Sequence, residues 1–247
     1  MTDQPPHASD VFATVAQFRH CRTPQEVGSL LVATLAQFGL RNYAIGGMPT
    51  LGDLNPTRFL YHNWPKEWDK LYFERHYADV DPMPRAAMQS AMPLTIGEIR
   101  AGAAGFVPGP ETADFFANGE RLTGGKGLLV PISGPHGYHA IVVFVGDSEQ
   151  FSPDDRARLH LLAIYAHDRL LTLFGWSQGA TGPQLSHREV EVLRLSRAGM
   201  QDEAIARHLG ISARTVRFHF ENARHKLGAK TRAEALVTAV GMHLLGP

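Results

Sequence analysis

The sequence predicts an α+β domain followed by a small all-α domain. Over residues 185–245, short helical patterns follow one another, and each boundary carries a helix start or stop signal. Before residue 175, apolar β-branched runs alternate with helical patterns, which is typical of helices packed around a mostly antiparallel sheet. We therefore expect an α/β/α layered domain over residues 1–174, a linker over 175–184 and an all-α domain over 185–247.

The linker is predicted by composition, because GWSQGATGPQ at residues 175–184 is rich in glycine and small polar residues. A length of 247 residues, 44% hydrophobic and 19% charged, is typical of a globular protein with two domains. Cys21 is the single cysteine, which excludes an intrachain disulfide. The N-terminal MTDQPPHASD has neither the basic nor the apolar region of a signal peptide, and no apolar run reaches membrane-spanning length. We therefore expect a cytoplasmic protein.

The first domain begins with two helical patterns that follow a polar N-terminal segment. Residues 11–18 carry an apolar stripe at helical spacing. Thr23 and Glu26 form a capping box with Pro24 at the first helical position, which predicts a helix ending at Gly39. Further helices are expected over residues 64–76, after residue 84, over residues 111–122, and over residues 152–174, where Ser152 and Asp155 supply the cap.

Four strands are expected between these helices, over residues 42–48, 58–62, 127–133 and 138–145. A turn-rich loop at residues 52–56 separates the first two strands, and Gly134-Pro135-His136-Gly137 between the last two is typical of a hairpin. A domain of this kind commonly encloses a ligand between one face of the sheet and the helices that cover it.

The second domain contains two helices joined by a tight turn, EAIARHLGISARTVRFHFENARHKLG at residues 203–228. Gly210 ends the first helix, because glycine adopts the left-handed conformation without the penalty of a Cβ atom. Ser212 can cap the second helix by accepting a hydrogen bond from a free backbone N–H. The buried stripe of the second helix is expected at Val216, Phe220, Ala223 and Leu227.

The opposite side of this second helix is expected to face outward, with Arg214, Thr215, Arg217, Phe218, Glu221 and Arg224. A second helix that presents cations near its start has the geometry that enters a DNA major groove. From Leu185 onward the chain has ten Lys and Arg against six Asp and Glu, so this part carries +4 and the remainder −4. A basic module joined to an acidic domain fits contact with DNA phosphates.

The flanking segments complete a compact four-helix module. Ser186 and Glu189 form a capping box for a helix that stops at Gly199. Thr231 and Glu234 form a second box that opens the last helix. Through LSHREVEVLRLSRAGM and EAIARHLGISARTVRFHFENARHKLGAKTRAEA, the module closely resembles the LuxR/GerE-type helix-turn-helix domain.

This resemblance implies binding to double-stranded DNA. We expect a homodimer, formed through the first helix, the helix at residues 152–174 and the final helix. Two such modules read a palindromic operator with half-sites about 10 bp apart. Arg214 and Arg217 are the expected base contacts, and Phe218 lies with them on the outward face. The phosphate contacts are expected from Thr215, Arg224 and Lys226.

The segment YHNWPKEWDKLYFERHYADVDPMPR at residues 61–85 carries the ligand signal. Trp64, Trp68 and Tyr72 lie four residues apart and therefore share one helix face. Such a stripe alone is more often core than a binding site. However, indole and phenol groups need polar partners when buried, and a carboxylate at Asp81 is costly to bury without a donor.

The same segment resembles the autoinducer-binding domain of LuxR-type quorum-sensing regulators. The pattern W-x3-Y, then DP, then G-x3-P is present as Trp68, Tyr72, Asp81, Pro82, Gly127 and Pro131. The resemblance implies that an acyl-homoserine lactone lies between sheet and helices. It implies that the Trp68 indole N–H binds the lactone carbonyl, that Asp81 accepts the ligand amide N–H, and that Tyr72 polarises the acyl carbonyl. Two further aromatics, Trp64 and Tyr61, are expected at the ligand.

The sequence departs from the pattern of this family at three expected pocket positions. Ile96 stands where the family commonly has tryptophan, and Leu129 and Val143 stand where it often has threonine and serine. Fewer hydroxyl and N–H groups make the pocket more apolar. The segment at residues 61–85 and IYAHDRLL at residues 164–171 look most like the subgroup that recognises branched-chain or aryl homoserine lactones.

Other functions find little support in the sequence. The thirteen histidines show no metal-ligand spacing, Gly124-Gly125-Lys126-Gly127 lacks the Walker pattern, and no nucleophile elbow is present. We therefore expect no catalytic residue, metal or cofactor. Three alternatives stay open: a LuxR-type solo regulator with another ligand or none, which Ile96 favours; a phosphorylation-driven response regulator, whose acidic receiver residues are not found; and an enzyme acting on lactones.

Overall fold

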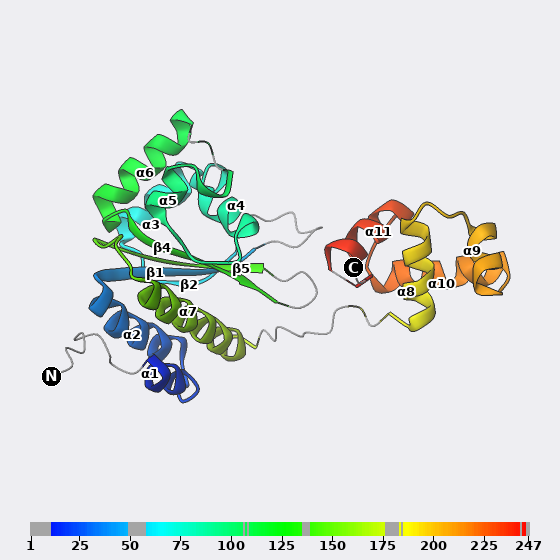
Figure 1. Ribbon diagram of the computed structural model, residues 1–247, viewed down its shortest axis with the longest axis horizontal. Helices are drawn as coiled ribbons and strands as arrows, with labels where there is room; N and C mark the ends of the chain where they lie inside the picture. The colour runs from blue at the N-terminus through cyan, green and yellow to red at the C-terminus, as the bar shows by residue number, and fades with distance from the viewer. Residues whose placement is uncertain are drawn as a thin grey trace. The chain divides into compact units, whose positions relative to one another are not determined.

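A computed structural model of the protein describes residues 11–48, 58–105, 107, 109–134, 139–175, 183, 185–242 and 244–245. The chain divides into two compact units (Figure 1). The first unit holds all strands and helices α1 to α7, and the second holds helices α8 to α11. The expected linker, apart from residues 175 and 183, lies outside the described residues, as do the loop at residues 52–56 and most of the hairpin turn at 134–137.

The centre of the first unit is an antiparallel five-stranded sheet in the order β2-β1-β5-β4-β3. The strands are β1 (Leu40–Gly47), β2 (Arg58–His62), β3 (Leu94–Thr95), β4 (Lys126–Ser133) and β5 (His139–Gly146). Strands β4 and β5 pair along their whole length and are almost continuously buried, because helices cover both faces of the sheet. The four expected strands are present, and β3 is an addition.

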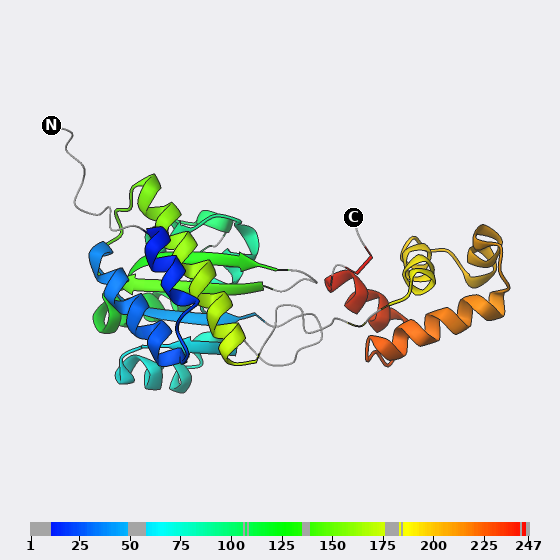
Figure 2. The ribbon, with the colours of Figure 1, turned by 90° about the horizontal axis from the view of Figure 1, so that it is seen from below.

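Helices lie on both faces of this sheet, as Figures 1 and 2 show. One face is covered by α1 (Val11–Phe18), α2 (Pro24–Leu35) and α7 (Pro153–Leu173). The other is covered by α3 (Lys66–Glu74), α4 (Pro82–Gln89), α5 (Ile96–Arg100) and α6 (Pro110–Thr123). Short 3₁₀ turns lie at Ala36–Phe38, Tyr77–Asp79 and Ala103–Gly105. The α/β/α layering agrees with the sequence prediction.

Helix α5 is the other element that the sequence patterns did not predict. It begins with a capping box, in which Thr95 Oγ1 accepts from the Glu98 N–H at 3.0 Å and Glu98 Oε2 accepts from the Thr95 N–H at 2.7 Å. Arg156, near the start of α7, forms an ion pair with Glu98 at 2.9 Å. The ion pair joins α5 to the opposite layer and fixes the position of Ile96.

The second unit contains α8 (His187–Arg197), α9 (Asp202–Leu209), α10 (Ala213–Lys226) and α11 (Arg232–Gly241). Gly210 has a left-handed φ of 67°, and Ser212 Oγ accepts from the Thr215 N–H at 3.0 Å. Val216 and Phe220 of α10 lie in the apolar core of the unit. The two helices and the turn thus have the expected geometry. Among the helices that the structure describes, none combines the length and apolar character needed to cross a lipid bilayer.

Candidate functional site

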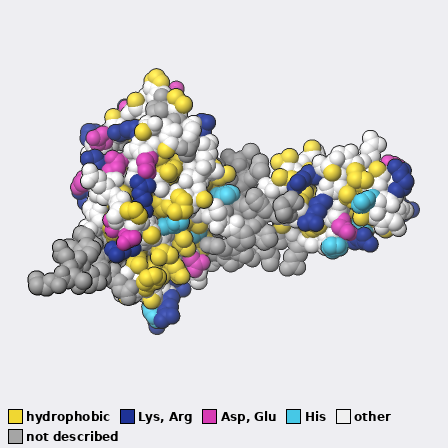
Figure 3. Space-filling model, viewed as in Figure 1, with side chains coloured by type: hydrophobic (Ala, Val, Ile, Leu, Met, Phe, Trp, Pro, Cys, Tyr) yellow, Lys and Arg dark blue, Asp and Glu magenta, His cyan; other side chains and the backbone are white. Residues whose placement is uncertain are grey.

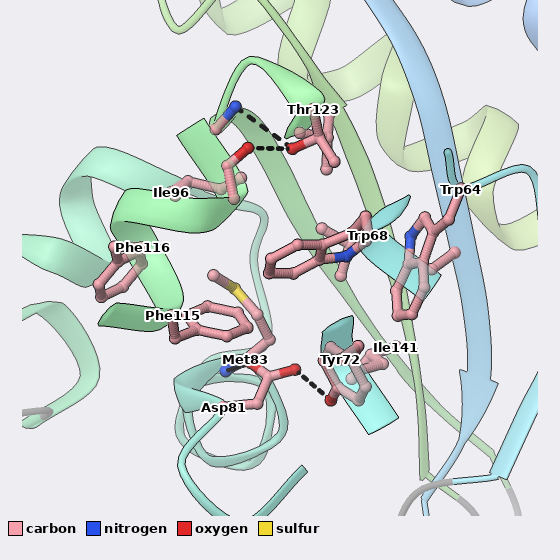
Figure 4. Close-up of a pocket in the computed structure, with 15 residues that line it drawn as sticks. Trp64, Trp68, Tyr72, Asp81, Met83, Ile96, Phe115, Phe116, Thr123 and Ile141 are labelled. Carbon is pink, nitrogen blue, oxygen red and sulfur yellow. Dashed lines mark hydrogen bonds between the residues drawn. The ribbon is translucent and has the colours of Figure 1, made fainter. Parts of the chain in front are cut away.

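A cavity of about 60 Å³ lies between the sheet and the layer of α3 to α6 (Figure 4). Fifteen residues line it, and most of its surface is apolar. Aromatic rings contribute much of the wall, namely Trp64, Trp68, Tyr72, Phe115 and Phe116. The few polar side-chain atoms in this wall can therefore orient a bound molecule.

Three aromatic rings form a packed group at one side of the cavity. The ring centroid of Trp64 lies 5.1 Å from that of Tyr72 and 6.2 Å from that of Trp68. Trp68 and Tyr72 are separated by one turn of α3, and their ring centroids are 5.9 Å apart. Both side chains are buried. The i, i+4 spacing therefore places Trp68 and Tyr72 against the cavity, whereas Trp64 precedes α3, which begins at Lys66, and does not share the predicted helix face.

Asp81 caps helix α4 and contributes a carboxylate to the cavity. Its Oδ1 accepts a hydrogen bond from the Met83 N–H at 2.8 Å, and its Oδ2 accepts one from the Tyr72 hydroxyl at 2.9 Å. Burial raises the pKa of Asp81 to about 6, against the lowering effect of these two hydrogen bonds. Each carboxylate oxygen has two lone pairs, so Asp81 keeps the capacity to accept a further N–H.

Trp68 contributes the complementary donor. Within the part of the chain that the structure describes, its indole N–H has no hydrogen-bond acceptor. The side chain is 5% exposed and borders the cavity. An indole N–H at the edge of an apolar cavity gains a hydrogen bond when a bound molecule brings an acceptor to it. The cavity thus combines one carboxylate acceptor and one open N–H donor within an apolar wall.

The second unit presents a different surface on helix α10. Arg214 and Arg217 are exposed near the start of the helix, and neither forms an ion pair with the residues that the structure describes. Phe218 is exposed beside them, at 61%. Figure 3 shows Lys and Arg side chains over the visible face of this unit. An exposed cationic helix of this kind can bind the phosphates and base edges of DNA.

Comparison with known proteins decides between the possible uses of these two surfaces. Residues 23–170 match the family described as the autoinducer binding domain, and residues 183–239 match the bacterial regulatory proteins of the luxR family. The chain belongs to the LuxR family of autoinducer-binding transcriptional regulators. It is therefore a DNA-binding regulator and not an enzyme, and its small molecule is a signal ligand rather than a cofactor.

Relatives of this LuxR-family chain come from several bacteria. It is 29% identical to the transcriptional activator protein BjaR1 of Bradyrhizobium diazoefficiens, over 88% of each chain. It is 28% identical to RpaR, an HTH-type quorum sensing-dependent transcriptional regulator of Rhodopseudomonas palustris, over 85% of each chain. The crystal structure of Escherichia coli SdiA has the same fold, with a TM-score of 0.71 and 21% identity, over 96% of this chain and 98% of SdiA.

Most of the residues predicted for the ligand site border the cavity. Those that do are Trp64, Trp68, Tyr72, Asp81, Ile96 and Val143. Leu129 is not among the lining residues, but it is fully buried in the same apolar cluster as Trp68 and Ile96. It pairs with Val143 across β4 and β5 and therefore faces the same side of the sheet, so the expectation is corrected only in that neighbouring side chains cover Leu129.

The expectation for Tyr61 also requires correction, because its ring lies away from the cavity. The ring centroid of Tyr61 is 5.9 Å from that of Tyr43 and 6.4 Å from that of Phe174, at the end of α7. Neighbouring positions in a strand point to opposite faces, and Tyr61 pairs with Ile45, whereas the adjacent Ala44 borders the cavity. Tyr61 therefore faces the α2 and α7 layer of this LuxR-family regulator.

Two residues predicted to bind phosphates form contacts inside the second unit. Arg224 pairs with Glu221 at 2.6 Å and donates to the Ala229 carbonyl at 2.9 Å. Lys226 pairs at 2.8 Å with Glu189 of α8, a carboxylate that is 3% exposed. The partner of Arg224 lies three residues earlier on α10 itself, whereas the partner of Lys226 lies on another helix, which the spacing within α10 does not reveal. These contacts help to hold α10, and the phosphate role of both residues stays a prediction.

Sequence reasoning also missed several residues of the cavity wall. Those with side chains that it did not single out include Met83, Phe115, Phe116, Thr123, Ile141 and Val145. Ile141 and Val145 alternate with Val143 along β5, so the period of two was an available signal. No comparable signal marks Thr123. Within the described residues, no group of three His, Cys, Asp or Glu side chains could hold a metal ion.

Proposed function

We propose that this LuxR-family regulator binds an acyl-homoserine lactone in the cavity and controls transcription as a homodimer on palindromic DNA. In this proposal residues 1–174 bind the ligand and dimerise, residues 175–184 form a linker, and residues 185–247 bind DNA. The protein works in the bacterial cytoplasm, where promoter DNA is accessible to it.

The observation that carries the ligand proposal is that one aromatic cavity is lined by both a carboxylate acceptor, Asp81, and an indole N–H donor, Trp68. An acyl-homoserine lactone offers an amide N–H donor, two carbonyl acceptors and an apolar tail. Asp81 accepts the amide N–H, and the Trp68 indole donates to the lactone carbonyl. Burial, together with Asp81, raises the pKa of Tyr72, so its hydroxyl keeps its hydrogen at physiological pH and donates it to Asp81, which orients that acceptor. The amide N–H and the lactone carbonyl of the ligand head then each have a partner, which supplies specificity.

The aromatic wall supports a branched or aryl acyl group. Phe115 of α6 packs beside Trp68 and Tyr72, with ring centroids 5.6 and 6.5 Å away, and Phe116 continues this wall beside Phe115. Aromatic rings pack well against a flat or branched tail. Ligand pockets commonly span about 300 Å³ or more, whereas this cavity encloses about 60 Å³. Lining side chains must therefore move to admit the whole ligand, and a compact tail needs the smallest movement.

The alternative is a regulator that responds to another small molecule. It is favoured by Ile96 and Val143, because both line the cavity and neither offers a polar group to an acyl-homoserine lactone. A structure of SdiA has been solved in complex with octanoyl-rac-glycerol, at 20% identity to this chain and a TM-score of 0.70. A neutral acylglycerol is therefore a useful second ligand class to test.

The ligand proposal is tested by thermal unfolding of the full chain with lactones that carry straight, branched and aryl tails, and with octanoyl-glycerol. Ligand binding raises the unfolding temperature by mass action. We expect a rise with a branched or aryl lactone that is lost in Asp81→Ala and kept in the control Tyr61→Phe, whose side chain lies outside the cavity. A rise with the glycerol ester alone overturns the lactone proposal.

Exposed apolar side chains support the dimer. Ile164 and Tyr165 lie on α7, and Val237 and Val240 lie on α11, all of them exposed in the single chain. Apolar side chains of this size are commonly buried at a homodimer interface. Sedimentation of the ligand-bound protein on DNA with two half-sites about 10 bp apart tests the proposal. One chain per operator, or equal affinity for a single half-site, contradicts it.

A further inference from the structure

Thr123 places a hydroxyl group in the cavity wall, away from the groups that bind the ligand head. It is the last residue of α6, and its side chain is buried. Figure 4 shows Thr123 on one side of Trp68, and Asp81 with Tyr72 on the other side. If Asp81 and Trp68 hold the lactone and its amide, the acyl tail extends along the aromatic wall toward Thr123.

The hydrogen bonds of Thr123 leave its oxygen able to accept but not to donate. Its Oγ1 donates its single hydrogen to the Gly119 carbonyl at 2.7 Å, and it accepts from the Gly125 N–H at 3.4 Å (Figure 4). A hydroxyl has one donor and two acceptor lone pairs, and the second of these bonds is long. The remaining capacity of Oγ1 is therefore that of an acceptor.

The bond from Thr123 to Gly119 is not in itself a sign of ligand binding. Threonine near the end of a helix often donates to the carbonyl four residues earlier. What distinguishes Thr123 is that both it and Gly125 border a cavity whose wall is otherwise mostly apolar. A polar group on a ligand tail would lose water there, and its burial is unfavourable unless a partner is present.

We propose that Thr123 is a specificity residue that accepts a hydrogen bond from a donor group on the acyl tail. This inference rests on the proposed binding of acyl-homoserine lactones and names the tail chemistry that the site selects. A tail hydroxyl donates to Thr123 Oγ1 and is preferred to a plain hydrocarbon tail. A keto group is disfavoured, because it is only an acceptor and Thr123 Oγ1 has no free hydrogen to donate to it. The single hydrogen of that hydroxyl is already donated to the Gly119 carbonyl.

The test compares lactones that differ by one tail group, with the full chain as wild type, Thr123→Val and Thr123→Ser. The probes are cinnamoyl and 4-hydroxycinnamoyl lactones, and three octanoyl lactones: one unsubstituted, one with a hydroxyl on the last carbon and one with a keto group on the carbon before it. Dissociation constants are measured by quenching of tryptophan fluorescence. A neutral hydrogen bond contributes about 1 kcal/mol, so we expect the wild type to prefer a hydroxyl tail about fivefold within at least one matched set.

The two variants distinguish the effect of the Thr123 hydroxyl on binding from the effect of the shape of the side chain. Thr123→Val keeps the shape, so we expect it to bind unsubstituted tails like the wild type and to lose the preference for hydroxyl. Thr123→Ser keeps the acceptor and the preference. Unfolding temperatures without ligand confirm that both variants are folded.

The outcomes distinguish this inference from the proposed function. If unsubstituted lactones bind, but the wild type ignores the tail hydroxyl in every matched set, the assignment of Thr123 is wrong and the proposed function stands. A preference that persists in Thr123→Val also overturns the assignment. If no lactone binds at all, the proposed function fails and the inference fails with it.

Discussion

The hydroxyl of Tyr72 donates to Asp81 Oδ2 at 2.9 Å, and this bond joins two elements that meet at the ligand cavity. Tyr72 belongs to α3, whereas Asp81 precedes α4 and caps it through the Met83 N–H. The carboxylate is therefore held from two sides before a ligand arrives. A preoriented acceptor loses little freedom when it binds, which improves affinity.

If Asp81 accepts the ligand amide N–H as proposed, its charge makes ligand affinity dependent on pH. Burial raises the pKa of Asp81 from 3.8 to about 6, so the carboxyl is ionised at neutral pH and gains a proton as pH falls through about 6. The ligand amide N–H prefers the ionised form as its acceptor. We expect the dissociation constant to rise by up to about tenfold per pH unit below pH 6. Titrations between pH 5 and pH 8 measure this change, and an equal slope in Asp81→Asn contradicts it.

The carboxyl group of Asp81 is also expected to affect the free energy of unfolding. Low pH is expected to weaken ligand binding but to increase the stability of the protein without ligand. Because Asp81 binds its proton more tightly when folded, its contribution to stability is greatest below pH 4 and is lost as pH rises through about 6. We expect Asp81→Asn to remove this contribution and to raise stability at pH 7 relative to the wild type. Urea unfolding without ligand at pH 4.5 and pH 7 measures it. A variant that is less stable than the wild type at both values contradicts the prediction.

Removal of the Tyr72 hydroxyl tests two effects of its hydrogen bond to Asp81, one on the pKa of Asp81 and one on the stability of the protein. The hydrogen bond from Tyr72 lowers the pKa of Asp81, so Tyr72→Phe raises that pKa further. We expect the midpoint of the pH dependence of ligand binding to move upward, together with a loss of stability of about 1 kcal/mol. Tyr43→Phe is the control, since Tyr43 is equally buried but lies outside the cavity wall. An unchanged midpoint in Tyr72→Phe would show that the bond does not tune Asp81.

The indole N–H of Trp68 can be tested without disturbing the aromatic wall. Trp68→Phe keeps a ring beside Tyr77 and Phe115 but removes the donor. We expect ligand affinity to fall about tenfold, because the lactone carbonyl is left buried without a donor. Isothermal titration with the best lactone of the panel gives the change. Equal affinity in wild type and variant would exclude this hydrogen bond.

We expect replacement of Lys226 to reduce the stability of the second unit more than it reduces DNA affinity. Lys226→Ala leaves Glu189 buried without its cation, although Glu189 keeps the hydrogen bond from the Ser186 N–H at 2.7 Å. We expect the second unit to lose about 1 to 2 kcal/mol of stability, with Glu189→Gln losing a similar amount. Denaturant unfolding measures both. If Lys226→Ala has normal stability and binds all DNA sequences more weakly to the same extent, this prediction is contradicted and Lys226 contacts DNA phosphates instead.

Arg217 is expected to determine base preference. It is exposed on α10 and has no ion-pair partner among the described residues, so its guanidinium is available to a guanine edge. Arg217→Ala should reduce the affinity difference between the operator and its single-base variants by about 1 to 3 kcal/mol at one position. Competition binding at fixed salt gives this difference. Equal loss on every operator variant would assign Arg217 to the phosphates.

The sequence predicted the chemistry of the site better than its walls. Trp68, Tyr72 and Asp81 border the cavity, as the resemblance to the family pattern led us to expect, and their contacts with a ligand stay predictions. Tyr61 was misplaced because its side chain points to the face of the sheet covered by α2 and α7, and the sequence of one strand does not reveal which of its two faces meets the ligand layer. Contacts such as that between Lys226 and Glu189 join residues far apart in the chain, so helix periodicity does not predict them.

Helix α5 could have been predicted from the sequence, because its first residues carry a capping-box pattern. The residues Thr95-Ile96-Gly97-Glu98 have the capping-box pattern that opens α5, and the same pattern correctly located the starts of α7 and α8. The helix has only five residues, too few for an apolar stripe to repeat. Its importance comes from tertiary structure, since Ile96 reaches the cavity.

The two halves of α10 differ in how freely they can change during evolution. The later half is tied to α8 by Lys226 and to the following loop by Arg224, so substitutions there disturb the fold. The earlier half carries Arg214, Arg217 and Phe218 on an exposed surface. If the earlier half makes the proposed base contacts, new promoter preferences can arise by drift at a few surface positions while the scaffold stays intact. The same division would then let an engineer retarget the regulator by transplanting those positions.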